Sequence, residues 1–366
     1  MRIAEYRVHR VPASHRGDWI LLETHDADGT VGWGEGSSST DDDATASEIE
    51  AVMSALAADE HDLARVRDHL ATAAPDDKPR RTAFSAIEHA FTDLAARRNG
   101  VSVAAMLAGK GASVMDSVPV YANVNRMCRD RAPDTVAAAG RAAMDGGLTR
   151  VKFAPFDEVS PERLAAEGTD IAMPGVERLA ALRDAIGPDA ELMLDCHWRF
   201  APDTVPFLAE QTRALGIDWI EDPLPDFDPG VMQELRDLSG ARIAGGEALL
   251  MVEDFEALAE SGAVDVLIAD VKFVGGVGTL DRICKLAADN GLAFAPHNPS
   301  GPVSTAASAH VVAANPNGLI LEYAFGEVSW RQEFARGEAL IGDRMAVAGP
   351  GFGIEIDWNA AGPRES

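Results

Sequence analysis

The sequence is short of cysteine, of basic residues and of long apolar runs, and each shortage excludes a class of protein. Only three cysteines (Cys128, Cys196 and Cys284) occur in 366 residues and no CxxC pair is present, so we do not expect a disulfide framework. The 32 Lys and Arg residues face 59 Asp and Glu residues, and the net charge of −27 argues against binding of nucleic acid phosphates. No apolar run approaches the roughly 18 residues of a membrane span, and the N-terminus is too charged for a signal peptide. We therefore expect a cytoplasmic protein with neither a nucleic acid nor a membrane as partner.

The first part of the chain has the pattern of a small α+β unit. Apolar and polar residues alternate at residues 1–12 and 19–35, and Asp26–Gly29 supplies turn residues between two apolar segments. From Thr40 to Gly100 the apolar spacing becomes helical. Strands followed by helices are typical of an α+β arrangement, which we assign to residues 1–117.

A different rhythm begins at Val118, where short apolar segments start to alternate with amphipathic helices. Because each crossover helix has to cover the outer face of the sheet, strands with short connections of this kind predict a closed parallel barrel over residues 118–323. The Gly-rich segment 324–366 is expected to return to the first unit. The expected strands are Val118–Val124, Thr149–Phe153, Glu191–Asp195, Asp218–Glu221, Arg242–Gly245, Val264–Asp270, Leu292–Ala295 and Gly318–Glu322.

Polar residues occur where these predicted strands end. From Asp195 onward they follow one another at steps of 26, 26, 23, 27 and 25 residues, which matches one strand and one helix per step. A single carboxylate in such a place is usually solvated, but a series in phase predicts a shared site at the end of the barrel where barrel enzymes place their chemistry. The series is Lys152, Asp195, Glu221, Glu247, Asp270, His297 and Glu322.

Three of these residues predict a metal site. Asp195, Glu221 and Glu247 end successive strands, so their oxygens can converge on one point. Ligands that are all carboxylates favour a hard cation, and three of them leave room for water and substrate, which suits Mg²⁺ better than a closed Zn²⁺ site. The alternative, three carboxylates paired with Lys or Arg, is disfavoured because the neighbouring segments WIEDPLPDFD and LLMVED add further acid.

His297 and Asp270 predict a general base. They end neighbouring strands, so the carboxylate can lie beside the imidazole, fix its tautomer and raise its basicity. A lone histidine is more often structural. The glycine pair that follows Asp270 and the HNPSG context of His297 favour the catalytic interpretation.

Motifs along nearly the whole chain add up to a family resemblance. They are VGWGEG, SAIEHAFTDL, VPVYANVN, LDCHW, WIEDPL, GGE, DVKFVGG, PHNPSG, LEY and GPGFGIEID. This series resembles the enolase superfamily, specifically its mandelate racemase branch and the sugar-acid dehydratases. The resemblance implies an α/β fold with a modified (β/α)₇β barrel, capped by an α+β domain that both ends of the chain build. It also implies one Mg²⁺ per active site and abstraction of a proton next to a carboxylate.

Two further roles come from the resemblance. Lys152 corresponds to a lysine beside the substrate carboxylate, where its ammonium would help to stabilise the second negative charge. Glu322 corresponds to a glutamate that donates a hydrogen bond to the same carboxylate, which requires it to carry or share a proton. We expect a small-molecule carboxylate as substrate, and a homo-oligomer.

The second predicted strand departs from the racemase pattern. That branch has Lys-x-Lys there, with the second lysine as a base opposite the histidine, whereas this chain has Lys152, Phe153 and Ala154. Ala154 cannot accept a proton, so racemisation, which needs an acceptor on each face of the carbon, loses support. Dehydration needs one base and one acid. His197, two residues after Asp195, is expected on the same face of its strand and resembles the acid of galactonate and mannonate dehydratases.

Substrate specificity is expected to depend on loops of the first unit and on strand ends. The loop around Ala13–Asp18 and the loop Ser37–Asp43 are the candidates for closure over the barrel mouth. Lys272, two residues after Asp270, is expected either to face the pocket or to pair with an acid. Candidate substrate-binding residues are Arg16, Trp19, Asn123, Asn125 and Arg199.

The leading hypothesis is a Mg²⁺-dependent dehydratase of an aldonate or aldarate that yields a 2-keto-3-deoxy acid. The first alternative is a racemase or epimerase of the same superfamily, with Lys152 as the second base. The second alternative is a non-catalytic barrel, which the intact series of strand-end residues disfavours.

Overall fold

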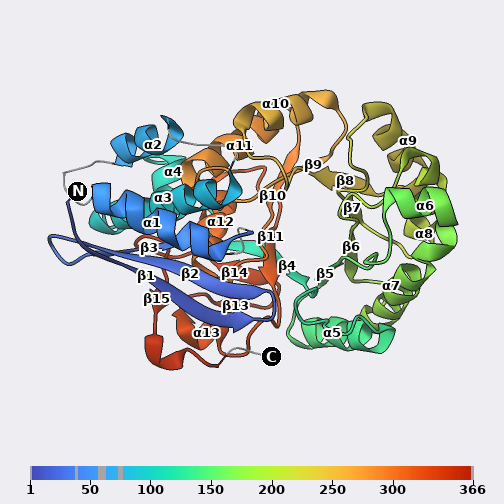
Figure 1. The fold of residues 1–366 in the computed structure, drawn as a ribbon, viewed down its shortest axis with the longest axis horizontal. Helices are drawn as coiled ribbons and strands as arrows, with labels where there is room; N and C mark the ends of the chain where they lie inside the picture. Colours follow the sequence, from blue (N-terminus) through green and yellow to red (C-terminus); the bar gives the residue numbers. More distant parts are fainter. Residues whose placement is uncertain (1, 38–39, 57–62, 73–76, 364–366) are drawn as a thin grey trace.

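The computed structural model describes residues 2–37, 40–56, 63–72 and 77–363, and these residues form a cap and a barrel side by side (Figure 1). The expected α/β class, with a capping sheet and a barrel of alternating strands and helices, is confirmed. Among the described residues, no helix is long and apolar enough to cross a membrane.

The cap begins with three antiparallel strands, β1 (Ile3–Ser14), β2 (Gly17–Asp26) and β3 (Val31–Glu35). Alternate residues of β2 enter two different hydrophobic cores, because successive side chains of a strand point to opposite faces. Ile20 packs with the cap helices, whereas Trp19 packs with the core that the barrel and the C-terminal segment share. The sheet is therefore covered on both faces.

The cap helices are α1 (Asp42–Leu56), α2 (Leu63–Thr72), α3 (Lys78–Arg98) and α4 (Val103–Ala108). Helix α3 lies directly on β3, and the glycines of the VGWGEG motif permit this close approach. A Cβ atom on Gly34 would lie 1.9 Å from the carbonyl oxygen of Ala86. The motif therefore has a packing role, since a larger residue would separate the helix from the sheet.

The barrel contains eight parallel strands in the order β4 to β10, with β11 paired to β4. A parallel bridge between Phe294 and Gly318 joins the other side of the ring. Most of the strand bounds lie within one or two residues of those expected from the sequence. The strands are β4 (Ser117–Asn123), β5 (Arg150–Phe153), β6 (Glu191–Asp195), β7 (Trp219–Glu221), β8 (Arg242–Gly245), β9 (Val266–Ala269), β10 (Ala293–Pro296) and β11 (Leu321–Ala324).

Helices connect each barrel strand to the next, which gives the (β/α)₇β order. Their apolar faces pack on the outer surface of the strands, and a separate apolar cluster that includes Tyr121, Met193 and Trp219 fills the interior. The interior is thus a packed core, and the polar strand ends lie at its edge. The helices are α5 (Pro133–Asp145), α6 (Pro161–Glu167), α7 (Met173–Ile186), α8 (Val205–Ala214), α9 (Pro229–Ser239), α10 (Val252–Ser261), α11 (Val277–Asp289) and α12 (Pro302–Ala314).

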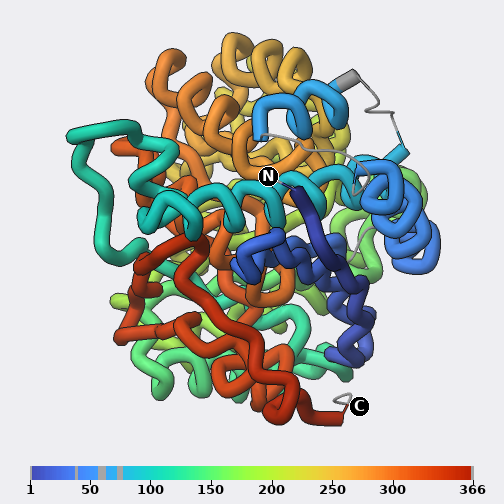
Figure 2. Tube along the Cα trace, turned by 90° about the vertical axis from the view of Figure 1, so that its left-hand side faces the viewer, coloured from blue at the N-terminus to red at the C-terminus, as the bar shows by residue number. Residues whose placement is uncertain are grey.

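The C-terminal segment returns to the cap and also touches the barrel. Trp330 packs against Trp19 of β2 with ring centroids 5.3 Å apart. In Figure 2 this red segment and the first, dark blue strands lie on the same side of the molecule. Strand β14 pairs with β4, so part of the segment extends the barrel sheet. The segment comprises α13 (Arg331–Phe334), β12 (Ala335–Arg336), β13 (Leu340–Ile341), β14 (Arg344–Ala346) and β15 (Glu355–Ile356).

Candidate active site

Three carboxylates converge at the carboxyl ends of β6, β7 and β8. Asp195 and Glu221 are the last residues of their strands and lie opposite each other in the parallel register, and Glu247 follows β8 by two residues. All three are buried, and one oxygen of each lies within 4.8 Å of the others. We call Asp195, Glu221 and Glu247 the strand-end carboxylates.

The electrostatics of this group fit a bound cation. Burial, together with Asp195 and Glu322, raises the pKa of Glu221 to about 7 although Lys152 opposes the shift, and burial with like charges raises the pKa of Glu247 well above its usual value. Oε2 of Glu221 and Oε2 of Glu247 are buried and accept no hydrogen bond among the described residues, although the second lies 3.2 Å from His297 Nε2. Such oxygens are costly unless a partner satisfies them. An arrangement of oxygen ligands alone suits a divalent metal ion.

Lys152 lies between two of the acidic side chains. Its Nζ is 2.6 Å from Glu221 Oε1 and 3.1 Å from Glu322 Oε1, and the lysine is almost fully buried. Burial lowers the pKa of Lys152, but Glu221 and Glu322 more than offset this and raise it well above the usual value. The side chain is therefore a fixed positive charge.

Glu322 on β11 is held by donors. Its Oε1 accepts from Asn123 Nδ2 at 2.5 Å and its Oε2 accepts from the backbone N–H of Asn298 at 2.6 Å. Burial favours the protonated form, yet Lys152, His297 and these donors together lower the pKa of Glu322. Without substrate, Glu322 is an acceptor, which differs from the proton-donating state that the resemblance implies.

His297 and Asp270 form the expected pair. His297 Nδ1 is 2.8 Å from Asp270 Oδ2, so the carboxylate can fix the ring orientation, and His297 Nε2 lies 3.2 Å from Glu247 Oε2. Lys272 completes the arrangement, because its buried Nζ lies 2.9 Å from the same Asp270 oxygen and also donates to Ser300. Burial opposes the charge on Asp270, but Lys272 and His297 lower its pKa far below the usual value. Asp270 is thus held as an anion.

His197 lies beside the strand-end carboxylates, although not for the reason that the sequence suggested. Strand β6 ends at Asp195, and the backbone of His197 is left-handed with a φ of 47°, so strand alternation does not position this residue. Instead its backbone N–H donates to Asp195 Oδ1 at 3.1 Å and its Nε2 lies 2.9 Å from Asp195 Oδ2. Burial lowers the pKa of His197, but Asp195 and Glu221 raise it above the usual value.

A cavity of about 260 Å³ lies beside these groups, and four of them line it, namely Asp195, His197, His297 and Glu322. Most of the sequence-predicted substrate residues line it, and so does Ala154, at the place where the racemase pattern has a lysine. Asn125 Oδ1 accepts from the backbone N–H of Ala154, so this amide is partly used within the protein. The predicted residues on the cavity wall are Arg16, Asn123, Asn125, Asp195, His197, Arg199, His297 and Glu322.

Trp19 is a correction to the sequence-based prediction. It is 1% exposed and packs against Trp330 and Phe334, and it is not among the described residues that line the cavity. Because β2 is covered on both faces, its tryptophan lies in the shared core and not over the barrel mouth. The loop Ser37–Asp43 includes residues 38 and 39, which lie outside the described residues, so its predicted role stays a prediction.

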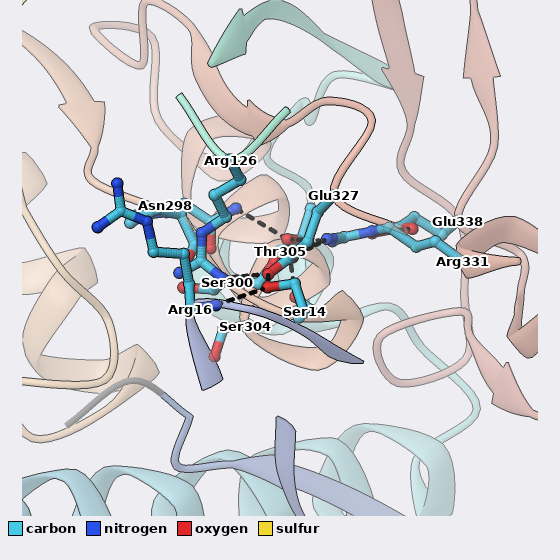
Figure 3. Close-up of polar contacts among 12 residues, drawn as sticks. Ser14, Arg16, Arg126, Asn298, Ser300, Ser304, Thr305, Glu327, Arg331 and Glu338 are labelled. Carbon is cyan, nitrogen blue, oxygen red and sulfur yellow. Dashed lines mark hydrogen bonds and ion pairs between the residues drawn. The ribbon is translucent and has the colours of Figure 1, made fainter. Parts of the chain in front are cut away.

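A buried ionic cluster connects the cap to the barrel, and sequence reasoning missed it. Glu327 pairs with Arg126, lies 3.7 Å from Arg331 and accepts from Ser14 Oγ at 3.1 Å, and Arg331 makes a two-pronged contact with Glu338 at 2.7 and 2.8 Å (Figure 3). We call Arg126, Glu327, Arg331 and Glu338 the closing cluster. Its members are far apart in the sequence, and no spacing pattern predicts it. Lys272 was noticed, but only the structure assigns its partner.

The comparisons with known proteins agree with this geometry. Residues 8–108 match the mandelate racemase / muconate lactonizing enzyme N-terminal domain, and residues 134–360 match the enolase C-terminal domain-like family. D-xylonate dehydratase of Haloferax volcanii is 29% identical over 93% of this chain and 84% of that protein. D-galactarolactone cycloisomerase of Agrobacterium fabrum is 28% identical over 93% and 89%. The structure of a mandelate racemase/muconate lactonizing enzyme-like protein from Rubrobacter xylanophilus superposes with a TM-score of 0.83 at 26% identity, over 98% of this chain and 96% of the other.

Proposed function

Because the chain belongs to the mandelate racemase / muconate lactonizing enzyme family of the enolase superfamily, we propose that it is a Mg²⁺-dependent dehydratase of a sugar acid. The names of several relatives, D-xylonate dehydratase among them, support the reaction class. The product would be a 2-keto-3-deoxy acid, formed with the loss of one water molecule and no change in overall oxidation state.

The strand-end carboxylates would hold the cation. When bound, it supplies positive charge for the second negative charge that develops when a proton next to a carboxylate is removed. Lys152 adds a fixed ammonium at the same place and remains charged because two carboxylates flank it.

The proton chemistry is assigned to two histidines. His297, oriented by Asp270, takes the proton from C2 at Nε2. His197 protonates the hydroxyl on C3, so the C3–O bond breaks and water leaves. The enol that results takes up a proton at C3 as it becomes the 2-keto acid.

One observation carries the proposal. His197 and His297 line the same cavity, and the second possible base of the racemase pattern is replaced there by Ala154. Racemisation would need Lys152 as a neutral acceptor, which two flanking carboxylates oppose. One general base and one general acid that line the same cavity are the groups that an elimination requires.

A substrate panel in D₂O with Mg²⁺ tests the proposal. We expect a set of aldonic and aldaric acids to include one that forms a 2-keto acid. His297→Asn should lose both keto acid formation and C2–H exchange, whereas His197→Asn should lose dehydration and keep exchange. His25→Asn, in a cap histidine that pairs with Glu23, is the matched control. Recovered substrate with inverted, deuterated C2 and no keto acid would overturn the proposal, and turnover unaffected by His297→Asn would indicate that the barrel is not catalytic through this site.

A further inference from the structure

Arginines gather on the wall of the active-site cavity. Arg16, Arg126, Arg131 and Arg199 all line it, together with three carboxylates, those of Asp157, Asp195 and Glu322. In a chain with a net charge of −27, this is a local concentration of positive charge. Neutral hydroxyl groups of a substrate do not require it.

Two of these arginines have partners within the protein. Arg126 pairs with Glu327 and donates to the carbonyl oxygen of Pro299. Arg131 donates from Nε to Asp157 at 2.7 Å and from Nη2 to the carbonyl oxygen of Ala154. Because carboxylates neutralise the charges of Arg126 and Arg131, we assign these two arginines a structural role in the cavity wall.

Arg16 and Arg199 carry charge that no described carboxylate matches. The backbone N–H of Arg16 is anchored on Ser14, while its exposed guanidinium extends away from the closing cluster and has no partner in the described part of the chain (Figure 3). Arg199 uses Nη1 for the carbonyl oxygens of Asp157 and Val159, at 3.1 and 2.8 Å, and both of these are neutral. Its Nε and Nη2 have no hydrogen-bond partner among the described residues.

The same positive charge acts on the neighbouring His15. Burial lowers the pKa of His15, and Arg16, Arg129 and Arg126 lower it further, with only Glu327 opposing them. Positive charge at the mouth would also attract an anion to a protein whose overall charge repels it.

We propose that Arg16 and Arg199 form a subsite for a second anionic group of the substrate, so that the sugar acid is a diacid. This inference rests on the proposed function, because it names the distal end of the same substrate. A planar guanidinium matches the two oxygens of a carboxylate, and it also matches a phosphate. The cavity of about 260 Å³ is below the roughly 300–1,000 Å³ of typical ligand pockets, which favours a short aldarate over a bulkier phosphorylated aldonate.

Matched substrates provide the test. With Mg²⁺, kcat/KM is measured for hexaric acids, for the aldonic acids of the same stereochemistry and for their 6-phosphates. We expect the best hexarate to exceed its aldonate by about 10- to 100-fold, the effect of a hydrogen bond to a charged group. Arg16→Gln and Arg199→Gln should each lower the ratio of hexarate to aldonate kcat/KM toward one, through a higher KM for the hexarate. Arg199→Lys retains the charge and covers the case in which the glutamine variant misfolds. Arg141→Gln, on an exposed position of α5, is the control.

Each outcome has a distinct meaning. Equal or better turnover of the aldonate, or an equal loss for both substrates in Arg16→Gln, overturns the diacid inference and leaves the proposed function intact. A preference for the 6-phosphates overturns the choice of carboxylate. If no acid reacts, the proposed function fails, and calorimetric binding of hexarate against aldonate to wild type and Arg16→Gln still decides the subsite: equal affinities overturn it.

Discussion

Two buried groups of charged residues lie near the barrel mouth, and they differ in how their charges are matched. In the closing cluster, two arginines form ion pairs with two glutamates, so the positive and negative charges are equal in number. Around the strand-end carboxylates, Lys152 is the single lysine or arginine in contact within the described residues, and further acids, Asp222 and Glu322, lie nearby.

The difference separates a structural role from a functional one. A matched cluster neutralises its own charge and connects the cap to the barrel. An unmatched cluster costs stability, and it persists where a ligand supplies the missing charge. Perturbing one of the two groups should therefore change stability and turnover to different extents.

The largest effect is expected for Glu221→Gln. Under the proposed function it removes a cation ligand, and it removes a contact of Lys152, so kcat/KM should fall by at least about 1,000-fold, which corresponds to several kcal/mol of lost charge stabilisation. Stability without Mg²⁺ should stay constant or increase, because one of several like charges is gone. Calorimetric Mg²⁺ titration and urea unfolding measure the two effects. A marked loss of stability in EDTA would contradict the contrast.

Arg331→Met should have the opposite effect to Glu221→Gln: the protein should lose stability, and the folded fraction should keep its turnover. It leaves Glu338 buried without a cation and Glu327 with Arg126 alone, and breaking a buried pair typically costs about 3–5 kcal/mol. Urea unfolding should show this loss, while turnover of the folded fraction at low temperature is retained. Arg336→Met is the control, because its pair with Asp357 is 70% exposed on the arginine side and should change stability by less than about 1 kcal/mol. A mutant as stable as wild type would show that the closing cluster does not hold the cap.

Lys272→Met tests whether a buried lysine outside both groups positions the pair of Asp270 and His297. Lys272 is buried, does not line the cavity and pairs with Asp270, so its loss should let Asp270 and the His297 ring shift. We expect kcat to fall about 10- to 100-fold, a positioning effect, with KM nearly unchanged. Partial recovery in Lys272→Arg would distinguish positioning from a general packing defect. Lys285→Met, which removes an exposed pair with Asp281, is the control.

The smallest effect concerns pH. In EDTA, Glu221 has its pKa raised to about 7, so the folded protein holds a proton that the unfolded chain has lost above about 4.5. The folded state binds more protons in this window, and stability therefore falls as pH rises from about 4.5 to 7, by ~1–3 kcal/mol. Saturating Mg²⁺ should remove the part of the decrease that Glu221 causes, because the cation replaces the proton, whereas the part from remote buried acids such as Asp93 remains. Urea midpoints at pH 5 and 7.5 test this, and an equal decrease with and without Mg²⁺ would contradict it.

Local spacing predicted much of the site because the barrel repeats. Each strand–helix step brings one strand end to the same edge, so Asp195, Glu221 and Glu247 could be grouped from sequence alone. The pairing of Asp270 with His297 follows from neighbouring strands in the same way. A periodic pattern therefore predicts the end of the barrel at which a residue lies.

Other features depend on tertiary contacts that no local pattern encodes. Trp19 is a candidate substrate-binding residue by its position beside the loop around Ala13–Asp18. In the structure Trp330, more than 300 positions later in the chain, covers it. His197 owes its place to a left-handed backbone after the strand. Arg126 and Glu327, which are 201 residues apart, meet only because β11 closes the ring beside β4.

The hydrogen bond from Ser14 to Glu327 joins residues 313 positions apart, and it has a consequence for synthesis. The cap strands are synthesised long before Glu327 and Trp330, the residues that cover and anchor them. Contacts of such long sequence separation form late and slowly. During translation, Trp19 of the nascent β1–β2 hairpin therefore stays uncovered until the barrel and the segment that follows it have been synthesised.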